Sequence, residues 1–275
     1  MVGVGLINGS FALALKGNSN LIFGGSDLSD SNLEKAKERG VISHAFSLEE
    51  GIKWADCILI GTPVDSIKEL LPTILDRITK KQFVVDFGST KASICETVKD
   101  HPNRAHFLAT HPIAGTEHSG PEAAFPELFR EQNLIICERE KADPVLTKYF
   151  LTIAEEAGFY FTFMSAQEHD RHLAYISHLS HISSYVLSNT VLQKEKDGEV
   201  ILDLAGSGFE STVRLAKSSP AMWSSIFHEN KQMVLDSISA YQQELENLRN
   251  AIENDDVSGV STYLEEGRKI RKILK

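Results

Sequence analysis

The sequence predicts a doubly wound α/β domain followed by an all-helical domain. Apolar runs of strand length alternate with helical segments up to about residue 164, as in sheets that carry helices on both faces. After residue 165 the apolar residues recur at helical spacing and no convincing strand follows. A chain of 275 residues is long enough for two modest domains. We therefore expect a sheet domain over residues 1–164 and a helical domain over residues 165–275.

The composition indicates a globular protein and excludes several kinds of partner. The 38 Asp and Glu residues outnumber the 28 Lys and Arg residues, which gives a formal net charge of -10. A surface of this charge repels nucleic acid and anionic membranes. We therefore expect a small-molecule substrate, and an anionic one would need a locally basic pocket.

The cysteines and the apolar runs bear on the compartment. Cys57, Cys95 and Cys137 are odd in number and widely spaced, which favours neither a disulfide framework nor a thiolate metal site. No apolar run approaches the ~18 residues that a membrane span requires, and the N-terminus lacks the pattern of a signal peptide. We expect a cytoplasmic protein without a metal and without membrane association.

The first fourteen residues indicate the end of a strand, a glycine turn and the start of a helix. Gly3 and Gly5 match the glycines that allow a tight turn and the close approach of a pyrophosphate to a helix N-terminus. Asn8 stands where a third glycine is usual, so we expect the helix and the strand to pack slightly farther apart. Only two residues precede Gly3, whereas a strand usually has about five, so we expect the natural reading frame to begin upstream of Met1.

A second strand over residues 21–26 ends at Asp27. An acid at this place in dinucleotide-binding folds hydrogen-bonds the adenosine ribose. Residues 28–32 contain no Arg or Lys for a 2'-phosphate, so we expect NAD rather than NADP as the cofactor. The alternative is that Asp27 or Asp30 caps the helix that follows.

The next strands complete a Rossmann-type parallel sheet. They are predicted over residues 55–61, 83–86, 107–109, 134–137 and 159–163, with helices over residues 66–78 and 144–156. Their continuous apolar runs are typical of strands buried on both faces. Loops with small or hydroxyl side chains follow two of these strands, at Thr62-Pro63 and at residues 87–91. We expect cofactor contacts from Gly3, Gly5, Leu6, Ile7, Asp27, Thr62 and Pro63.

A histidine is placed where the strand over residues 107–109 ends. His111 is followed by Pro112 and, three residues later, by Gly115, which disfavour an ordinary helix. The carboxyl ends of parallel strands form the ligand-binding rim of such sheets, so we expect His111 to act there as a proton acceptor. The alternative is a polar turn whose histidine caps a neighbouring backbone group.

The second half of the chain is predicted to be helical. One helix covers residues 166–194, Asp197-Gly198 interrupts the pattern, and Gly206 with Gly208 forms a further turn. Ser219-Pro220 opens a long helix through Glu253, and Asp255-Asp256 opens the last one. Helices of this kind do not easily bury all their apolar faces alone, so we expect a homodimer built through this domain.

Two groups of residues in this half suggest anion binding. Ser177 and His181 share a helix face at i and i+4, beside His178. With His169 and His172 they resemble a metal site, but no third ligand stands at a recognisable spacing; the alternatives are donors to an anion or ordinary buried histidines. Arg214 follows the glycine turn, and its planar guanidinium suits a carboxylate. The other interpretation of Arg214 is a surface salt bridge.

These residues together resemble the prephenate and arogenate dehydrogenase family. The resemblance runs in order over nearly the whole chain. Its motifs are Gly3-Val4-Gly5-Leu6-Ile7, Asp86-Phe87-Gly88-Ser89-Thr90-Lys91, His111-Pro112-Ile113-Ala114-Gly115-Thr116-Glu117, Ser177-His178-Leu179-Ser180-His181, Gly208-Phe209 through Arg214, and Pro220-Ala221-Met222-Trp223.

The resemblance implies an NAD-dependent oxidative decarboxylation of prephenate to 4-hydroxyphenylpyruvate in tyrosine biosynthesis. It implies that His111 accepts the proton of the 4-hydroxyl and that Ser89 orients it. It further implies that Arg214, His181 and Ser177 bind the substrate carboxylate, and that Glu117, next to Thr116, gates the mouth of the pocket. Both Thr116 and Glu117 are expected to contact the substrate.

The sequence leaves three alternatives open. The substrate can be arogenate instead of prephenate, because Glu210 stands where a relative can carry a basic residue, and its negative charge favours an amino group. The protein can also be a β-hydroxyacid-dehydrogenase-like reductase, although such enzymes are expected to use a lysine base on the first long helix, where this chain has His178 and His181. The third alternative is a catalytically silent dinucleotide sensor, which leaves His111 and Arg214 unexplained.

Overall fold

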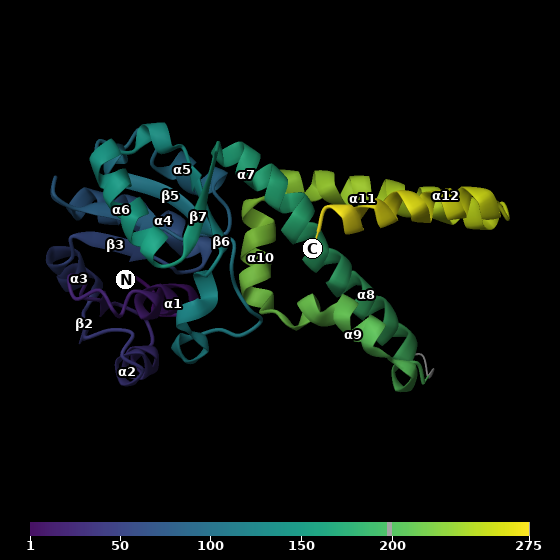
Figure 1. The fold of residues 1–275 in the computed structure, drawn as a ribbon, viewed down its shortest axis with the longest axis horizontal. Coiled ribbons are helices and arrows are strands. Elements are labelled where there is room, and N and C mark those ends of the chain that lie inside the picture. Colours follow the sequence, from purple (N-terminus) through teal and green to yellow (C-terminus); the bar gives the residue numbers. More distant parts are fainter. Residues whose placement is uncertain (197–199, 275) are drawn as a thin grey trace. The chain divides into compact units, whose positions relative to one another are not determined.

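The computed structural model describes residues 1–196 and 200–274. The chain forms two compact units, Met1–Asn230 and Lys231–Lys275, whose elements are labelled in Figure 1. The interruption predicted at Asp197-Gly198 lies outside the described residues.

The first unit contains the predicted sheet (Figure 1). Five strands follow one another in the order β3, β4, β5, β6 and β7. A shorter pair, β1 and β2, lies beside them, and Val2 bridges both Ser26 and Ile60 in parallel. The two groups of strands are therefore joined through the first residues of the chain. The strands are β1 (Gly24–Gly25), β2 (His44–Ala45), β3 (Cys57–Ile60), β4 (Phe83–Asp86), β5 (Phe107–Pro112), β6 (Gln132–Cys137) and β7 (Phe159–Met164).

The sheet is mixed, so the prediction that every strand runs parallel was wrong at one place. The strands β3, β4 and β5 are parallel, but β6 runs antiparallel to β5, with Ala109 opposite Cys137. Residues 113–131 join these two strands through the 3₁₀ turns Pro121–Ala123 and Pro126–Phe129, without a crossover helix. A parallel return requires such a crossover. The next pair, β6 and β7, is parallel and has α6 (Pro144–Glu156) between its strands.

Helices cover both faces of the sheet, which confirms the doubly wound fold. On one face, α4 (Val64–Arg77) and α5 (Ala92–Thr97) pack on Ile58, Ile60 and Val84. On the other face, α1 (Leu6–Ala14) and α6 pack on side chains that alternate with these, among them Leu59, Phe83 and Val85. Burial on both faces explains why the strands were continuous apolar runs in the sequence.

Two shorter helices complete the N-terminal part of the sheet domain. The helix α2 (Asp30–Glu38) begins at Ser29, whose hydroxyl accepts from the Asn32 amide, so neither Asp27 nor Asp30 is its N-cap. Gly40 follows α2 with a φ of +67°, a backbone conformation that favours glycine. The helix α3 (Leu48–Trp54) begins with a capping box formed by Ser47 and Glu50.

The helices after β7 differ from the prediction in two places. The run predicted over residues 166–194 is divided into α7 (Ala166–Leu173) and α8 (Leu179–Lys196) by a π-helical turn, Ala174–His178. Gly208 lies inside a helix, α9 (Ser207–Val213), because the turn ends at Gly206. A π-helical turn often marks a functional site, and this one carries Ser177 and His178.

The helix predicted from Pro220 to Glu253 is also divided. It forms α10 (Pro220–Glu229) and α11 (Lys231–Glu253). The residue between them is Asn230, whose backbone leaves the helical region at φ -108° and ψ 31°. Its buried side chain donates to the Asp170 carbonyl at 2.7 Å and lies 3.3 Å from Nδ1 of His178. This polar anchoring, which no periodicity reveals, accounts for the break.

The second unit is an αα-hairpin of α11 and α12 (Val257–Arg268), followed by the 3₁₀ turn Lys269–Lys272. Asp255 takes a left-handed conformation at the turn, and Asp256 caps α12 by accepting from the Gly259 amide at 2.8 Å, as predicted. Figure 1 shows the two helices side by side. Large apolar side chains of this unit are exposed, among them Leu235, Leu245, Ile252 and Leu264.

Candidate functional site

The glycine turn is built for the close approach of a ligand. Gly3 has a φ of +79°, and a Cβ atom there would lie 3.1 Å from both the Gly61 carbonyl oxygen and Thr62 Cγ2. Gly5 is the N-cap of α1 without a side-chain cap, and a Cβ atom there would meet nothing within 4 Å. Gly3 is therefore required by packing, whereas Gly5 leaves open space at a helix N-terminus, where a phosphate is favoured.

The Asn8 side chain ties α1 to the sheet instead of acting as a spacer. It is 1% exposed, and its Nδ2 lies 2.7 Å from the Gly3 carbonyl and 3.2 Å from the Val2 carbonyl. A Cβ atom on Gly61 would lie 2.6 Å from this nitrogen. Asn8 occupies the place of the third glycine. Its side chain fits there because Gly61, which follows β3, has no side chain of its own.

Asp27 lies directly beside the glycine turn. Its Oδ2 accepts from the Val4 amide at 3.0 Å, while Oδ1 accepts from the Ser29 amide at 2.9 Å and from Asn32 Nδ2 at 3.2 Å. A carboxylate has about four acceptor positions, so capacity for a ribose hydroxyl remains. The carboxylate is held rigidly at the place where the sequence predicts the ribose.

The loop after β3 completes this side of the rim. The Thr62 hydroxyl is buried and has no hydrogen-bond partner in the described part of the chain, and its methyl group lies against the Gly3 turn. Pro63 is exposed, and along α1 Leu6 is buried and Ile7 is half-buried. The open space at Gly5 and the unpartnered Thr62 hydroxyl fit a dinucleotide that crosses this rim.

His111 lies in β5, within the strand and not after it, on the face that also bears Phe107 and Ala109. Its Nδ1 is 2.8 Å from Nε2 of His169 in α7, and the two rings meet edge to face. Burial lowers the pKa of His111 well below its usual value of 6.5, and the neighbouring His169, Lys91 and His178 lower it further. His111 is therefore a neutral imidazole at neutral pH, as a proton acceptor has to be.

A buried charged network lies behind His111. Asp170 accepts from His169 Nδ1 at 2.7 Å and from the backbone amides of Lys91 and Ala92 at 2.7 and 2.8 Å. The Lys91 ammonium is fully buried and pairs with the Asp86 carboxylate, which is also fully buried. This network joins α7 to the loop after β4, the loop that carries Ser89.

Further side chains gather where α8 begins. His181 Nδ1 donates to the Ser177 carbonyl at 3.0 Å, and its ring stacks on Trp223 with centroids 3.5 Å apart. Burial lowers the pKa of His181, and burial lowers that of His178 to about 4. Trp223 is 7% exposed, and its buried indole N–H has no hydrogen-bond partner among residues 1–196 and 200–274. The predicted pair Ser177 and His181 is thus in contact, with an aromatic ring behind it.

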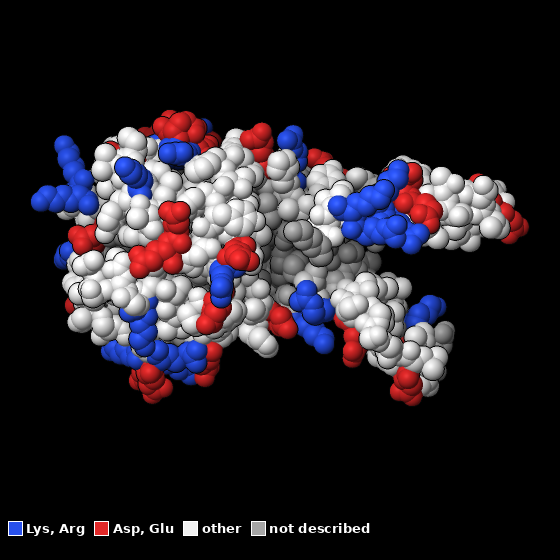
Figure 2. Space-filling model, viewed as in Figure 1, with Lys and Arg blue, Asp and Glu red and all other residues white. Residues whose placement is uncertain are grey.

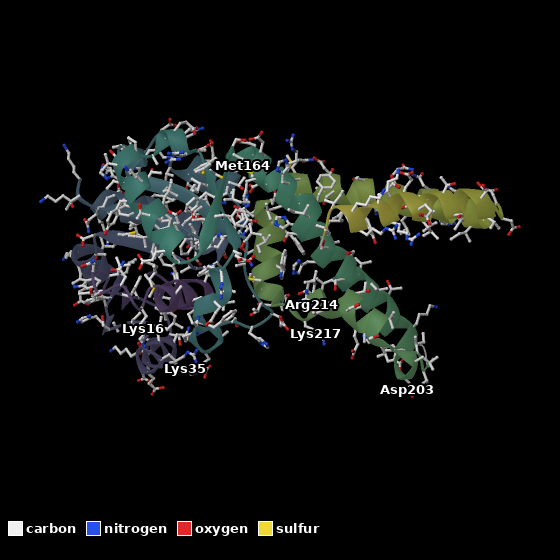
Figure 3. The ribbon with its side chains drawn as sticks, in the orientation of Figure 1. Lys16, Lys35, Met164, Asp203, Arg214 and Lys217 are labelled. Atoms are coloured by element: carbon white, nitrogen blue, oxygen red, sulfur yellow. The ribbon has the colours of Figure 1, made fainter. Side chains whose placement is uncertain are left out.

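Arg214 is exposed and forms no hydrogen bond or ion pair with any residue that the structure describes. Its positive charge lowers the pKa of His181, and it also lowers the pKa of Glu117, whose own backbone N–H contributes the largest effect. Figure 3 shows Arg214 and Lys217 where the chain returns from α9 towards α10. In Figure 2, from the same side, basic side chains lie at this place beside mostly uncharged surface.

The predicted site residues therefore fall into two groups. The glycine turn, Asp27 and the loop at Thr62 form the first. The second consists of His111 at the end of β5, Glu117 in the loop that follows, and Ser177, His181 and Arg214 on the helical segments after β7. Ser89 lies on the loop after β4, but its hydroxyl has no hydrogen-bond partner within the described residues. Thr116 is exposed next to Glu117, and its hydroxyl accepts from the His118 amide at 3.2 Å.

Sequence reasoning missed the residues that hold His111. His169 and Asp170 are adjacent on α7, and both are buried. The sequence shows only two polar residues within a predicted helix. That signal becomes informative only when the packing partner, β5, is known. Trp223 was part of a motif, but its stacking on His181 could not be derived from spacing.

Two features are absent from the described part of the chain, a metal-binding cluster and a membrane-spanning helix. Within residues 1–196 and 200–274, no group of three or more His, Cys, Asp or Glu side chains is arranged to hold a metal ion. Among the helices of the same residues, none is long and apolar enough to cross a membrane.

Comparison with known proteins identifies relatives over the whole chain. The family model of the prephenate dehydrogenase nucleotide-binding domain matches residues 11–161, and that of the prephenate dehydrogenase dimerization domain matches residues 165–266. The prephenate dehydrogenase of Bacillus subtilis is 31% identical over 98% of this chain and 74% of its own length. The cyclohexadienyl dehydrogenase of Zymomonas mobilis is 29% identical over 100% of this chain and 95% of its own length.

Solved structures agree with this assignment. The prephenate dehydrogenase of A. aeolicus, in complex with hydroxyphenyl propionate and NAD+, has a TM-score of 0.92 and 27% identity, covering 100% of this chain and 96% of that chain. The arogenate dehydrogenase of Synechocystis has a TM-score of 0.82 and 27% identity, covering 100% and 98%. With the glycine turn, the rim histidine and both family domains in register, this chain belongs to the prephenate dehydrogenase family.

Proposed function

We propose that this protein catalyses the NAD-dependent oxidative decarboxylation of prephenate to 4-hydroxyphenylpyruvate, a step of tyrosine biosynthesis. The observation that carries the proposal is the neutral His111 on the same rim as the open glycine turn. Bound NAD supplies a hydride acceptor for C4 of the substrate, while carbon dioxide leaves C1 and the ring becomes aromatic.

The cofactor is held by the first group of rim residues. Its pyrophosphate would be held at the N-terminus of α1, where Gly5 leaves space and the helix begins with Leu6 and Ile7. Asp27 would accept a hydrogen bond from the adenosine ribose, and Thr62 with Pro63 would border the cofactor on the β3 side. These contacts orient the cofactor, and orientation is a large part of what this reaction needs from the protein.

The substrate is held and deprotonated by the second group. Nε2 of His111 accepts the proton of the 4-hydroxyl as the carbonyl develops at C4, a general-base step, and Ser89 orients that hydroxyl. Arg214 binds a substrate carboxylate with His181 and Ser177, because a planar guanidinium matches a carboxylate in two parallel hydrogen bonds. Glu117 and Thr116 border the opening of the pocket.

The test is an assay of NADH formation with purified protein. Prephenate with NAD should give steady turnover and 4-hydroxyphenylpyruvate as the product. Binding of NAD without turnover on prephenate or arogenate would favour a silent sensor. Oxidation of a β-hydroxyacid without activity on either cyclohexadienyl substrate would favour the β-hydroxyacid dehydrogenase reading.

A second candidate substrate is arogenate, whose oxidation would form tyrosine directly. Glu210 favours it, because this exposed carboxylate precedes Arg214 by four residues and brings a negative charge to the proposed carboxylate-binding side. The two substrates compared in the same assay, at matched concentrations, would decide between the two activities.

We further propose a cytoplasmic homodimer built through the helical domain, residues 165–275. The exposed apolar side chains of α11 and α12 support this proposal, since a monomer rarely exposes so many large apolar side chains on two adjacent helices. The free and largely buried cysteines fit a reducing compartment. Sedimentation at micromolar concentration should give twice the mass of 30.5 kDa that one chain has.

A further inference from the structure

Three side chains from two elements form one hydrogen-bonded row that ends at His111. Asp170 Oδ1 lies 2.7 Å from His169 Nδ1, and His169 Nε2 lies 2.8 Å from His111 Nδ1. His169 is fully buried and Asp170 is 3% exposed. Nε2 of His111 is the remaining nitrogen of the row, and it has no partner within the described residues.

The row fixes where each proton lies. An ionised carboxylate only accepts, so the hydrogen between Asp170 and His169 belongs to Nδ1 of His169. Burial lowers the pKa of His169, so its ring is neutral and its Nε2 is an acceptor. The hydrogen between the two rings therefore belongs to Nδ1 of His111, and Nε2 of His111 carries a lone pair. The tautomer of one imidazole is set by the partner of its other nitrogen.

The carboxylate at the far end of the row cannot rotate away. Its Oδ1 also accepts from the Lys91 amide at 2.7 Å, and Oδ2 accepts from the Ala92 amide at 2.8 Å. The Asp170 carbonyl is in turn fixed by Asn230 Nδ2. The Asp170 carboxylate thus accepts from three N–H groups, and two of these belong to Lys91 and Ala92, where the loop that carries Ser89 enters α5.

We propose that His169 and Asp170 are positioning residues that hold His111 in the tautomer with a proton on Nδ1 and a lone pair on Nε2. Free histidine prefers the opposite tautomer, in which Nε2 carries the proton and is unable to accept another. In the reaction the substrate O–H bond breaks, a bond from Nε2 to that proton forms, and Nδ1 keeps its own proton towards His169. Only the identity of the substrate hydroxyl rests on the proposed function.

The direct test is the protonation state of the ring nitrogens. In protein labelled with ¹⁵N-histidine and saturated with NAD, long-range ¹H–¹⁵N correlation distinguishes a nitrogen that carries hydrogen from one that carries a lone pair. We expect Nδ1–H and a bare Nε2 for His111 in the unmodified protein. In His169→Leu and in Asp170→Asn the Nε2–H form should predominate. An unchanged Nδ1–H form in both variants would overturn the proposal.

The kinetic test uses a conservative rescue. His169→Leu should lower kcat about 100-fold, while the dissociation constant of NAD changes little. His169→Gln places an amide oxygen near the position of the former Nε2, and this oxygen can accept from His111 Nδ1. The kcat of His169→Gln should therefore be at least about tenfold higher than that of His169→Leu. His172→Leu and His172→Gln, at an exposed position of the same helix, are the matched controls and should retain normal kcat.

The outcomes separate this inference from the proposed function. If the unmodified protein turns over neither cyclohexadienyl substrate, the proposed function fails, but the tautomer of His111 still tests the row. If the unmodified protein is active and His169→Leu keeps kcat within about twofold, the proposed function stands and the inference is wrong. Equal losses in the leucine and glutamine variants of His169 would also contradict it, since packing and not the acceptor would then matter.

Discussion

The proposed proton-accepting region and the proposed carboxylate-binding region of this site are held in opposite ways. His111 is bonded to His169, which is fully buried and bonded in turn to Asp170. Arg214 is exposed and has no partner among the residues that the structure describes. From this difference we infer that the proposed base is organised before the substrate binds, and we expect the proposed carboxylate ligand, Arg214, to become ordered by the substrate.

This contrast has a physical reason. A general base works through the position of one lone pair, and a buried network fixes that position without reorganisation during the reaction. An arginine that binds an anion has to remain unpaired in the free protein, because a prior partner would compete with the ligand. The two regions should therefore respond differently to substitution.

The largest effect is expected from His111→Asn. Asparagine keeps a hydrogen-bonding group but offers no usable base, so turnover should fall 10² to 10⁴-fold, about 3 to 5 kcal/mol of transition-state stabilisation. The affinity for NAD should persist, because the glycine turn and Asp27 are untouched. Turnover and NAD binding are measured separately on the purified variant.

The pH dependence of the unmodified protein sharpens this prediction. The base has to be neutral, and burial holds the pKa of His111 well below 6.5. Activity should therefore persist as the pH falls through 6.5 and decline only at lower values. If His111→Asn retains more than about a tenth of normal turnover, or if its activity declines at the same acidic pH as that of the unmodified protein, the proton is accepted by another group.

Arg214→Ala should act on binding instead. Loss of a charged, two-pronged hydrogen bond costs about 1.5 to 3 kcal/mol, so the KM for prephenate should rise roughly 10 to 100-fold, with a smaller change in kcat. Lys217→Ala, at an exposed residue on the same segment, is the matched control. An unchanged KM for Arg214→Ala together with a raised KM for Lys217→Ala would move the carboxylate site to Lys217.

The two regions also differ in how far the sequence could predict them. Apolar runs and glycines predicted β4 and α6 to the residue, because each depends on local patterns such as strand burial and Asp143 capping α6. The reversal of β6 was missed, because it depends on the absence of a crossover helix between residues 113 and 131.

The candidate site shows the same limit. Gly3, Asp27 and His111 could be placed because each lies at or just beyond the carboxyl end of a strand. His169, Asp170 and Asn230 could not, since their roles arise from contacts between α7, the loop after β4 and the end of α10. A buried polar residue on a helix has no meaning in the sequence until its partner is known.

The choice between NAD and NADP tests the role of Asp27, beside the glycine turn. A 2'-phosphate would meet the Asp27 carboxylate, a contact between like charges that should cost on the order of 1 to 3 kcal/mol. The kcat/KM with NAD should exceed that with NADP accordingly, and Asp27→Asn should narrow the ratio. Equal kcat/KM values for the two cofactors in the unmodified protein would contradict the role of Asp27.

The buried histidines predict an acid-sensitive stability. The pKa of His178 is about 4 in the folded protein and about 6.5 when unfolded, so the unfolded state binds more protons between these values. His178 therefore favours folding fully above pH 6.5 and loses this effect as the pH falls, by about 1.4 kcal/mol between pH 7.5 and 5.5. Denaturant titrations at both pH values should show a smaller drop for His178→Asn than for the exposed control His172→Asn.

The smallest effect is expected at the exposed edge of the carboxylate-binding region. Glu210 lies in α9, and Arg214, four residues later, is the C-cap of this helix with helical backbone angles, so the spacing places the two residues one turn apart on the same side. Because Glu210 is exposed, solvent screens its charge, and its influence on a substrate amino group should be only about two- to fivefold. Glu210→Gln should lower the kcat/KM for arogenate relative to prephenate by that factor.

Asp203→Asn is the control, since Asp203 is also exposed and Figure 3 shows it at the far end of the α8 and α9 segment from Arg214. If both variants shift the ratio equally, net charge is responsible; if neither does, the choice between the two substrates is made inside the buried region around His111 and His181.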